Sequence, residues 1–260
     1  MIDYPNISPT ILEIGPLQIR WYGLSYIMGI FIGFAFFKPY LVKKYHLSLD
    51  DAYNCMLYTI VGIILGGRLG YVLFYDLSYF ISKPLEIFAV WHGGMSYHGG
   101  ALGCVIALIL YSLRYKVGLW GMLDLLGVSG AVAQGLGRIA NFINGELYGR
   151  VSNVPWAMVF PKAGVLPRHP SQLYEAFLEG FVLFVVLYVL LRKNILKTGQ
   201  LFAVYLVLYG LFRVFVEFFR EPDIQIGYIL GFFTMGQLLS SIMIIGGLII
   251  FFIKGRKGGE

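Results

Sequence analysis

The stretch YILGFFTMGQLLSSIMIIGGLIIFFI, residues 228–253, contains no Asp, Glu, Lys or Arg. The hydrocarbon core of a bilayer requires about 20 consecutive apolar residues in a helix, so this stretch predicts a membrane-spanning helix. Similar stretches recur along the whole chain and predict seven spans, at 21–42, 53–75, 97–114, 119–141, 172–191, 200–219 and 228–253. We therefore expect an all-α integral membrane protein, a bundle of seven transmembrane helices.

Composition agrees with this class. Of 260 residues, 58% are hydrophobic and 13% are charged, whereas soluble domains carry about 25% charged residues. The length suits one polytopic membrane domain over residues 1–260. The proline-rich start, residues 1–20, predicts an irregular arm that is not a signal peptide. Residues 142–171 predict a small cap loop, and the short segment 79–91 an interfacial stretch.

Basic residues indicate the orientation, because Lys and Arg concentrate in cytoplasmic loops. One set of loops holds eleven of them: Lys38, Lys43, Lys44, Arg114, Lys116, Arg192, Lys193, Lys197, Lys254, Arg256 and Lys257. The other set holds five: Arg20, Lys83, Arg150, Lys162 and Arg168. The rule predicts a cytoplasmic C-terminus, with the N-terminus, the arm and the cap on the opposite, periplasmic side.

The net charge of +6 fits contact with anionic lipid rather than nucleic acid, since no basic stripe interleaves with aromatic residues. The two cysteines, Cys55 and Cys104, lie in apolar runs without a CxxC pattern or nearby histidine ligands. They predict neither a disulfide nor a metal site.

Four arginines remain, in spans or at a span end, where a charge costs about 2.5–3.5 kcal/mol and usually has a function or a partner. They are Arg68, Arg138, Arg213 and Arg220. In the predicted orientation they share the outer half of the membrane with Tyr22, His98, Asn141 and Glu217. This predicts a polar site open to the periplasm and the outer leaflet.

The motif GRIANFINGELYGR, residues 137–150, ends the fourth span. Gln134, Arg138 and Asn141 are spaced i, i+4, i+7 and share one helix face. Glu146 and Gly149 follow in a polar turn. A helix end with a snorkelling arginine is the alternative, but it does not require the asparagines and the glutamate beside it.

A second motif, YGLFRVFVEFFREP, residues 209–222, places Tyr209, Arg213, Glu217 and Arg220 in one polar stripe. Glu217 lies one turn from Arg213 and neutralises it. A structural ion pair that locks helices together is the alternative, and it leaves Arg220 unexplained.

A third motif, HGGMSYHGG, residues 92–100, opens the third span. His98 is a candidate for proton transfer, because histidine titrates near neutrality; a structural interfacial histidine is the alternative. No role is assigned to His92. Asp124, in the inner half of the fourth span, predicts a structural pairing with Arg114 or Lys116.

Together with RHPSQLYEA, residues 168–176, these three motifs resemble the phosphatidylglycerol–prolipoprotein diacylglyceryl transferase family over about Trp21 to Gln237. The resemblance implies a bacterial inner-membrane protein that has seven spans with the N-terminus outside. It implies phosphatidylglycerol and the lipobox cysteine of a signal peptide as substrates, glycerol 1-phosphate as a product, and no metal or cofactor. The family's important residues fall on Tyr22, His98, Arg138, Asn141, Glu146, Gly149, Tyr209 and Arg213.

Sulfur displaces a phosphate ester in this reaction, so a base and fixed cations are expected. Our hypothesis is that Arg138 and Arg213 hold the phosphate, since guanidinium binds phosphate in a bidentate manner, and that His98 takes the thiol proton. Water or a phosphate oxygen is the alternative proton acceptor. Asn141, Glu146 and Tyr209 would orient these groups, and Tyr22 would contact headgroup or thiol.

Two other functions would each require a feature that the sequence does not show. An intramembrane serine protease built on Ser129 would require a histidine in a later span, and none is present. A transporter with an arginine-lined anion path should show repeated or broken helices in matching halves, and the sequence shows neither.

Overall fold

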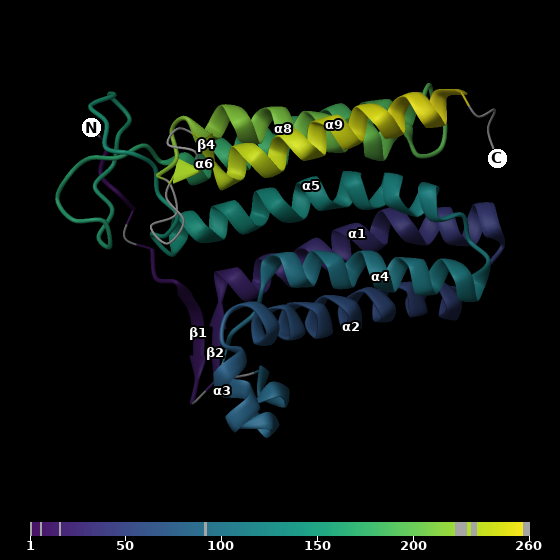
Figure 1. Cartoon of the computed structure of the whole chain (residues 1–260), viewed down its shortest axis with the longest axis horizontal. Helices are drawn as coiled ribbons and strands as arrows, with labels where there is room; N and C mark the ends of the chain where they lie inside the picture. The colour runs from purple at the N-terminus through teal and green to yellow at the C-terminus, as the bar shows by residue number, and fades with distance from the viewer. Residues whose placement is uncertain are drawn as a thin grey trace. The chain divides into compact units, whose positions relative to one another are not determined.

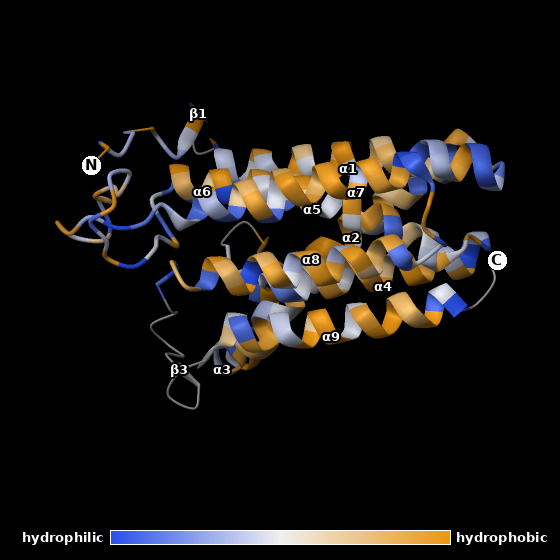
Figure 2. Ribbon diagram, turned by 90° about the horizontal axis from the view of Figure 1, so that it is seen from above, coloured by the Kyte–Doolittle hydropathy of each residue, from blue (hydrophilic) through white to orange (hydrophobic). Residues whose placement is uncertain are grey.

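The computed structural model describes residues 2–5, 7–15, 17–90, 93–221, 228–229 and 233–256. Within these ranges it contains seven helices long and apolar enough to cross a membrane, which confirms the predicted number. They are α1 (Trp21–Tyr45), α2 (Leu49–Phe74), α4 (Tyr97–Tyr115), α5 (Leu119–Ile143), the continuous helix Ser171–Lys193, α8 (Gln200–Glu217) and α9 (Met235–Arg256). Figure 2 shows these helices to be largely hydrophobic along their length, with hydrophilic residues toward their ends.

The start of the last span was predicted wrongly. Residues Tyr228–Ile229 and Phe233–Thr234 form two short antiparallel strands, β3 and β4, and helix α9 begins only at Met235. The hydroxyl group of Thr234 accepts a hydrogen bond from the backbone N–H of Gln237 (3.2 Å) and so caps the helix. Hydropathy alone does not separate a short apolar strand from the first turns of a helix.

The N-terminal arm is also more regular than its prolines indicated. Strands β1 (Thr10–Ile14) and β2 (Leu17–Arg20) pair in an antiparallel hairpin. Pro5 and Pro9 lie before the first strand, where they remove no hydrogen bond from the ladder. Helix α1 follows β2 without a gap.

The chain divides into two compact units, one formed by Met1–Gly33 with Leu123–Glu260 and the other by Phe34–Met122. In the second unit, helices α2 and α4 lie side by side (Figure 1). Their backbones meet at glycines: a Cβ added to Gly103 would lie 2.0 Å from the carbonyl oxygen of Gly62, and one added to Gly66 would lie 2.3 Å from that of Gly99. Small residues allow this close packing, which stabilises helix pairs in lipid.

The predicted interfacial segment 79–91 also lies in this second unit. It contains the end of a short helix, α3 (Leu77–Ser82), and a 3₁₀ turn, η1 (Pro84–Phe88). Pro84 begins the 3₁₀ turn because its ring cannot continue the preceding helix. Trp91 and His92 lie outside the described residues.

In the other unit, helices α8 and α9 pack side by side (Figure 1). The start of α8 is held by Asp124 of helix α5, whose carboxylate accepts the backbone N–H groups of Gly199 (2.7 Å) and Phe202 (2.7 Å). A carboxylate at a helix N-terminus satisfies free amides and complements the helix dipole. Asp124 is thus structural, as expected, but its hydrogen-bond partners are backbone amides in place of the predicted basic side chains.

The loop 142–171 packs against its own small core in the same unit. Phe142, Met158 and Phe160 are buried together, and Tyr4 of the N-terminal arm packs against them. The Tyr4 hydroxyl donates a hydrogen bond to the backbone carbonyl of Phe142 (2.6 Å). This core positions the turn that follows helix α5.

Candidate active site

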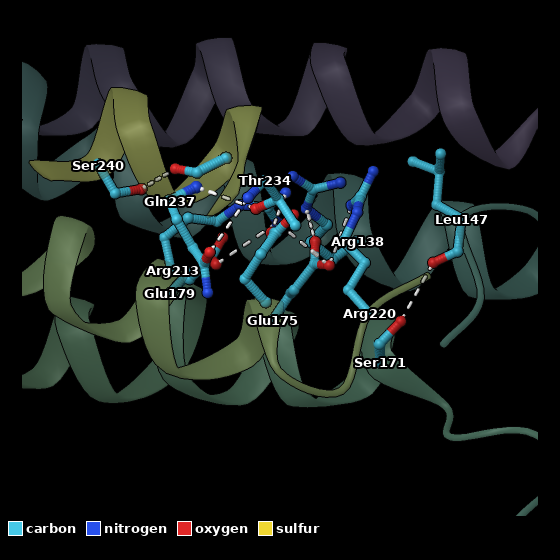
Figure 3. Close-up of polar contacts among 12 residues, drawn as sticks. Arg138, Leu147, Ser171, Glu175, Glu179, Arg213, Arg220, Thr234, Gln237 and Ser240 are labelled. Carbon is cyan, nitrogen blue, oxygen red and sulfur yellow. Dashed lines mark hydrogen bonds and ion pairs between the residues drawn. The ribbon is translucent and has the colours of Figure 1, made fainter. Parts of the chain in front are cut away.

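Three of the four intramembrane arginines gather in one cluster within the unit that contains helices α5 and α8. Arg138 comes from α5, Arg213 from α8, and Arg220 from the turn after α8. Figure 3 shows their side chains converging on two glutamates of the fifth span, Glu175 and Glu179. The two motifs that were singled out separately in the sequence therefore form one site.

Glu175 lies at the centre of this arginine cluster and is completely buried. Its carboxylate lies 2.6 Å from Nε of Arg138, 3.3 Å from Nη1 of Arg213 and 3.1 Å from Nη1 of Arg220. A buried charge is tolerated only when it is paired. One carboxylate shared by three guanidinium groups holds residues from three segments together.

Glu217 provides a second carboxylate for Arg213. The distance from its Oε2 to Nη2 of Arg213 is 2.9 Å, which confirms the pairing predicted from their i, i+4 spacing. The carboxylate also faces the start of α9, because a Cβ added to Gly236 would lie 2.7 Å from Glu217 Oε2. Arg213 is thereby fixed from two sides, by Glu175 and by Glu217.

Polar groups on α5 and α8 extend the cluster through Gln134 and Tyr209. The side-chain amide of Gln134 donates hydrogen bonds to Glu179 (3.1 Å) and to the hydroxyl group of Tyr209 (2.9 Å). Gln134 and Arg138 thus share one face of α5, and Tyr209 and Arg213 one face of α8, as their spacing predicted. Tyr209 takes part in the cluster through Gln134.

The fifth span brings its two glutamates to this place through a local change of helix type. Helix α6 (Ser171–Glu175) continues as a π-helical segment, η3 (Ala176–Val182), before α7 (Leu183–Lys193). Such segments are rare and recur at functional sites. Gly180 of this segment touches α5, since a Cβ there would lie 2.5 Å from Cα of Gly135. The contact places Glu175 within ion-pair distance of Arg138.

Arg138 is the most accessible of the three arginines. Its side chain is 18% exposed, against 12% for Arg213 and 8% for Arg220. In the described part of the chain, Glu175 is the single carboxylate within ion-pair distance of Arg138. Arg138 is therefore the arginine of the cluster that an incoming anion can reach most readily.

The predicted polar turn after α5 is organised around Glu146. The side-chain amides of Asn141 (2.8 Å) and Asn144 (3.1 Å) both donate to Glu146 Oε1. The backbone carbonyl of Glu146 accepts a hydrogen bond from the buried side chain of Gln172 (2.7 Å). Asn141 and Glu146 thus form a rigid pair directly after the turn of α5 that carries Arg138.

Gly149 has a structural explanation. A Cβ there would lie 2.5 Å from the carbonyl oxygen of Phe219 and 2.7 Å from the Cβ of His169. Its N–H donates to the carbonyl oxygen of His169 (2.9 Å). The missing side chain lets three backbone segments meet beside Arg220.

We expect Gly149→Ala to lower both thermal stability and activity, because the added methyl group would push backbone against backbone and overpacking costs about 1–3 kcal/mol. Gly137→Ala is the matched control, since a Cβ at Gly137 meets nothing within 4 Å. The measurement is the melting temperature of the purified proteins. Equal melting temperatures for the two variants would contradict this explanation of Gly149.

The other two predicted site residues lie outside these contacts. Tyr22 is an exposed residue of the first turn of α1, and its hydroxyl group shares a hydrogen bond with that of Tyr26 (3.1 Å). His98 is an exposed residue in the first turn of α4, and its ring stacks edge-on against Tyr97 (5.7 Å between centroids). His98 belongs to the unit Phe34–Met122, so its position relative to the arginines stays a prediction.

Arg68 was grouped with the site arginines because of its predicted depth in the membrane, but its hydrogen bonds lie within its own unit, Phe34–Met122. It is buried, and its guanidinium group donates to five backbone carbonyls, those of Glu86, Ile87, Ala89, Gly93 and Gly94. It also lies over the ring of Phe80, 5.0 Å from its centroid. These contacts fix the segment between α2 and α4, so the structure supports a structural role rather than one in the arginine cluster.

Glu175 and Glu179 are the site residues that the sequence analysis missed. The rule that singled out the arginines, that a charge inside a span is functional or paired, applies equally to acidic residues. Two glutamates at i, i+4 in an apolar span carry that signal. Without these two glutamates, the sequence predicted no acidic partner for Arg138 or Arg220. In the structure, both arginines pair with Glu175.

Comparison with known proteins identifies the family. The model of the family described as prolipoprotein diacylglyceryl transferase matches residues 9–253. Among similar proteins, those of Rhodopseudomonas palustris and Geobacter sulfurreducens are each 48% identical to this chain. The matches cover 99% and 98% of this chain and 93% and 98% of those proteins. A Rickettsia rickettsii protein is 48% identical over 95% of this chain and 96% of its own length.

All three relatives are named phosphatidylglycerol–prolipoprotein diacylglyceryl transferase. Their names confirm the predicted enzyme class, a transferase, and give no support to the transporter alternative. A multi-pass membrane protein is confirmed as well, by the seven apolar helices. The chain belongs to the prolipoprotein diacylglyceryl transferase family.

Proposed function

We propose that this protein transfers the diacylglyceryl group of phosphatidylglycerol to the lipobox cysteine in the signal peptide of a prolipoprotein. The products are a thioether-linked precursor and glycerol 1-phosphate. The observation that carries the proposal is the arginine cluster among apolar helices, in which three guanidinium groups gather and Arg138, 18% exposed, is the most accessible of them. A lipid in the bilayer can present its phosphate to such a cluster without leaving its leaflet.

The chemistry requires fixed positive charge. Sulfur forms a bond to a glycerol carbon while the bond from that carbon to the phosphate oxygen breaks, and the electron pair stays on the phosphate. The leaving phosphate therefore gains a second negative charge. Preorganised cations that face developing charge lower the barrier most, because they need not reorganise during the reaction.

The ion pairs within the cluster support this role. We infer that Glu175 and Glu217 hold Arg138 and Arg213 in place before the lipid arrives, so that the guanidinium groups need little further ordering. The structural alternative, in which the arginines only lock helices together, accounts for the ion pairs but not for the residual exposure of Arg138. The same ion pairs serve both roles. They hold the arginines in place, and the arginines held in this way then bind the phosphate.

Other site residues would act around Arg138 and Arg213, which together form the proposed phosphate clamp. Asn141 and Glu146, a hydrogen-bonded pair, would line the side of the site next to Arg138, and Gly149 would keep that turn in place. Tyr209 would orient polar groups through Gln134. Tyr22 would contact the headgroup or the thiol, and His98 would accept the thiol proton.

Transfer of labelled phosphatidylglycerol to a lipobox peptide, catalysed by the purified protein in vesicles, tests the function directly. Efflux of trapped anions from the same vesicles tests the transporter alternative. Labelled peptide without efflux is expected. Efflux without peptide labelling would overturn the proposal.

For His98, we expect His98→Gln to lower the transfer rate by about 10²–10⁴-fold, the usual contribution of a positioned base. Binding of phosphatidylglycerol at neutral pH should be unchanged. At saturating lipid, alkaline pH should restore part of kcat, because more of the thiol is then ionised. The measurement is kcat and KM across pH. A variant with the parental rate at every pH would leave His98 with a structural role.

We also propose that the protein lies in the bacterial inner membrane with its N-terminus and the loop 142–171 in the periplasm. Cysteines introduced at Lys162 and Lys43 should then differ: an impermeant thiol reagent added to intact spheroplasts should label position 162 and spare position 43. The native Cys55 and Cys104 are buried, so the unmodified protein is a suitable blank. The reverse labelling pattern would overturn the orientation.

A further inference from the structure

The arginine cluster contains three buried carboxylates as well as three arginines. If Glu175, Glu179 and Glu217 were all ionised, they would balance Arg138, Arg213 and Arg220 and leave the cluster without net charge. Such a cluster would attract an anionic phosphate weakly, since each arginine would already be neutralised. The proposed function therefore raises the question of whether all three carboxylates are charged.

Glu179 is the carboxylate with the poorest ionic partners. Its closest arginine contact, from Oε1 to Nη1 of Arg213, is 3.9 Å long. The corresponding distances are 2.6–3.3 Å for Glu175 and 2.9 Å for Glu217. Glu179 is completely buried, and its Oε1, like Oε2 of Glu175 and Oε2 of Glu217, has no hydrogen-bond partner in the described structure. The long distance to the nearest arginine is what sets Glu179 apart from the other two carboxylates.

The groups around Glu179 come from three segments. On its own helix, Glu175 lies one turn away. From α5, Gln134 donates a hydrogen bond to Glu179 Oε2 (3.1 Å), and Arg138 is the nearest basic residue of that helix. From α8, Arg213 is at 3.9 Å, and Tyr209 is linked through Gln134. Within the described residues, no arginine lies at hydrogen-bond distance from Glu179.

Burial penalises an ionised carboxylate far more than a neutral carboxyl group when no cation is in direct contact. Glu175 is already paired with the three arginines, and its negative charge would repel a second negative charge on Glu179. When two carboxylates share a site, one of them usually keeps its proton. The geometry assigns the proton to Glu179, because Glu175 and Glu217 have the close cations.

We propose that Glu179 is a positioning residue that stays protonated in the lipid-binding form and thereby sets the charge of the site. Three arginines then face two carboxylates, and the cluster carries one net positive charge. This charge matches the single negative charge of a phosphatidylglycerol phosphate. Glu179 makes and breaks no bond in the transfer reaction; it binds one proton from solvent, and ionisation of Glu179 at alkaline pH would release the lipid.

The protonated carboxyl group can be observed without any substrate. Infrared spectra of the lipid-free protein at neutral pH should show a carboxylic-acid C=O band that is absent in Glu179→Gln. Glu217→Gln is the matched control, since this carboxylate is nearly as buried but is paired at 2.9 Å; the band should persist there. A band that survives Glu179→Gln, or a wild-type protein without one, would overturn the proposal.

Lipid binding provides the second test, on the wild-type protein. Binding of dioleoylphosphatidylglycerol in nanodiscs of phosphatidylcholine should weaken by about tenfold per pH unit once Glu179 ionises. Glu179→Gln should bind equally well at neutral and alkaline pH. Wild-type binding that does not change with pH, or loss of lipid binding by a folded Glu179→Gln protein at neutral pH, would overturn the proposal.

This inference rests on the proposed function, but different experimental results would refute the two. A wild-type protein that shows the infrared band and pH-dependent lipid binding, yet transfers no lipid to a lipobox peptide at any pH, would refute the transfer function alone. A protein that transfers lipid without the band would refute the role of Glu179 alone.

Discussion

Glu175→Gln is expected to lower the free energy of unfolding by about 3–5 kcal/mol, the usual loss when one partner of a buried ion pair is removed. The substitution keeps the size of the side chain but removes the negative charge that Arg138, Arg213 and Arg220 share within 3.3 Å. Three guanidinium groups would then face each other with one charged carboxylate fewer. Transfer activity should fall with the stability, because the arginines lose their fixed positions.

The matched control for this prediction is Glu221→Gln. Glu221 also pairs with an arginine, Arg168, at 2.9 Å, but its side chain is 43% exposed. Solvent-exposed pairs contribute about 0–1 kcal/mol, so the control should unfold almost like the parent. Chemical denaturation in the same detergent measures both. Equal losses for Glu175→Gln and Glu221→Gln would show that Glu175 does not hold the cluster together.

Substitution of the two clamp arginines should have the largest effect on activity. Arg138→Lys and Arg213→Lys keep the positive charge but lose the planar fork that binds phosphate. Loss of one preorganised donor typically reduces kcat by about 10²–10³-fold, and we expect each lysine variant to fold and lose activity to that extent. The alanine variants should lose essentially all activity. The measurement is transfer of labelled diacylglyceryl to a lipobox peptide, with folding checked by thermal melting.

Arg192→Lys is the control for this series, because Arg192 is an exposed residue of the last turn of α7 and should keep the parental rate. Interactions that strengthen as the leaving group gains charge affect kcat more than KM. A change confined to KM would mean that the arginines only bind the lipid. A well-folded Arg138→Ala, Arg213→Ala double variant with near-parental transfer would refute the clamp.

Much of the fold follows from the sequence, because membrane insertion depends on local properties. An apolar stretch of about 20 residues spans the bilayer whatever its neighbours are, so seven spans were predicted and seven helices were found. Helical periodicity also has a local origin. It placed Tyr209, Arg213 and Glu217 on one face of α8 and Gln134 and Arg138 on one face of α5, and the structure confirms both faces.

Hydropathy was less informative where an apolar segment does not form a helix. Residues 228–234 are as apolar as the helix that follows, yet Tyr228 and Thr234 pair as strands before α9 begins. Residues 10–20 form a hairpin despite neighbouring prolines. In both places the backbone hydrogen bonds, rather than the side-chain hydropathy, decide the local structure.

The sequence alone determined that this protein is a seven-span membrane protein of the transferase family, with arginines placed in its membrane. Only the tertiary structure decided what those arginines contact. Arg68 binds backbone carbonyls of its own unit, whereas Arg138, Arg213 and Arg220 share Glu175. Ion pairing between helices depends on the distance between them, here set by the glycine contact between α5 and the fifth span. The spacing of residues along one helix gives no information about the distance between two helices.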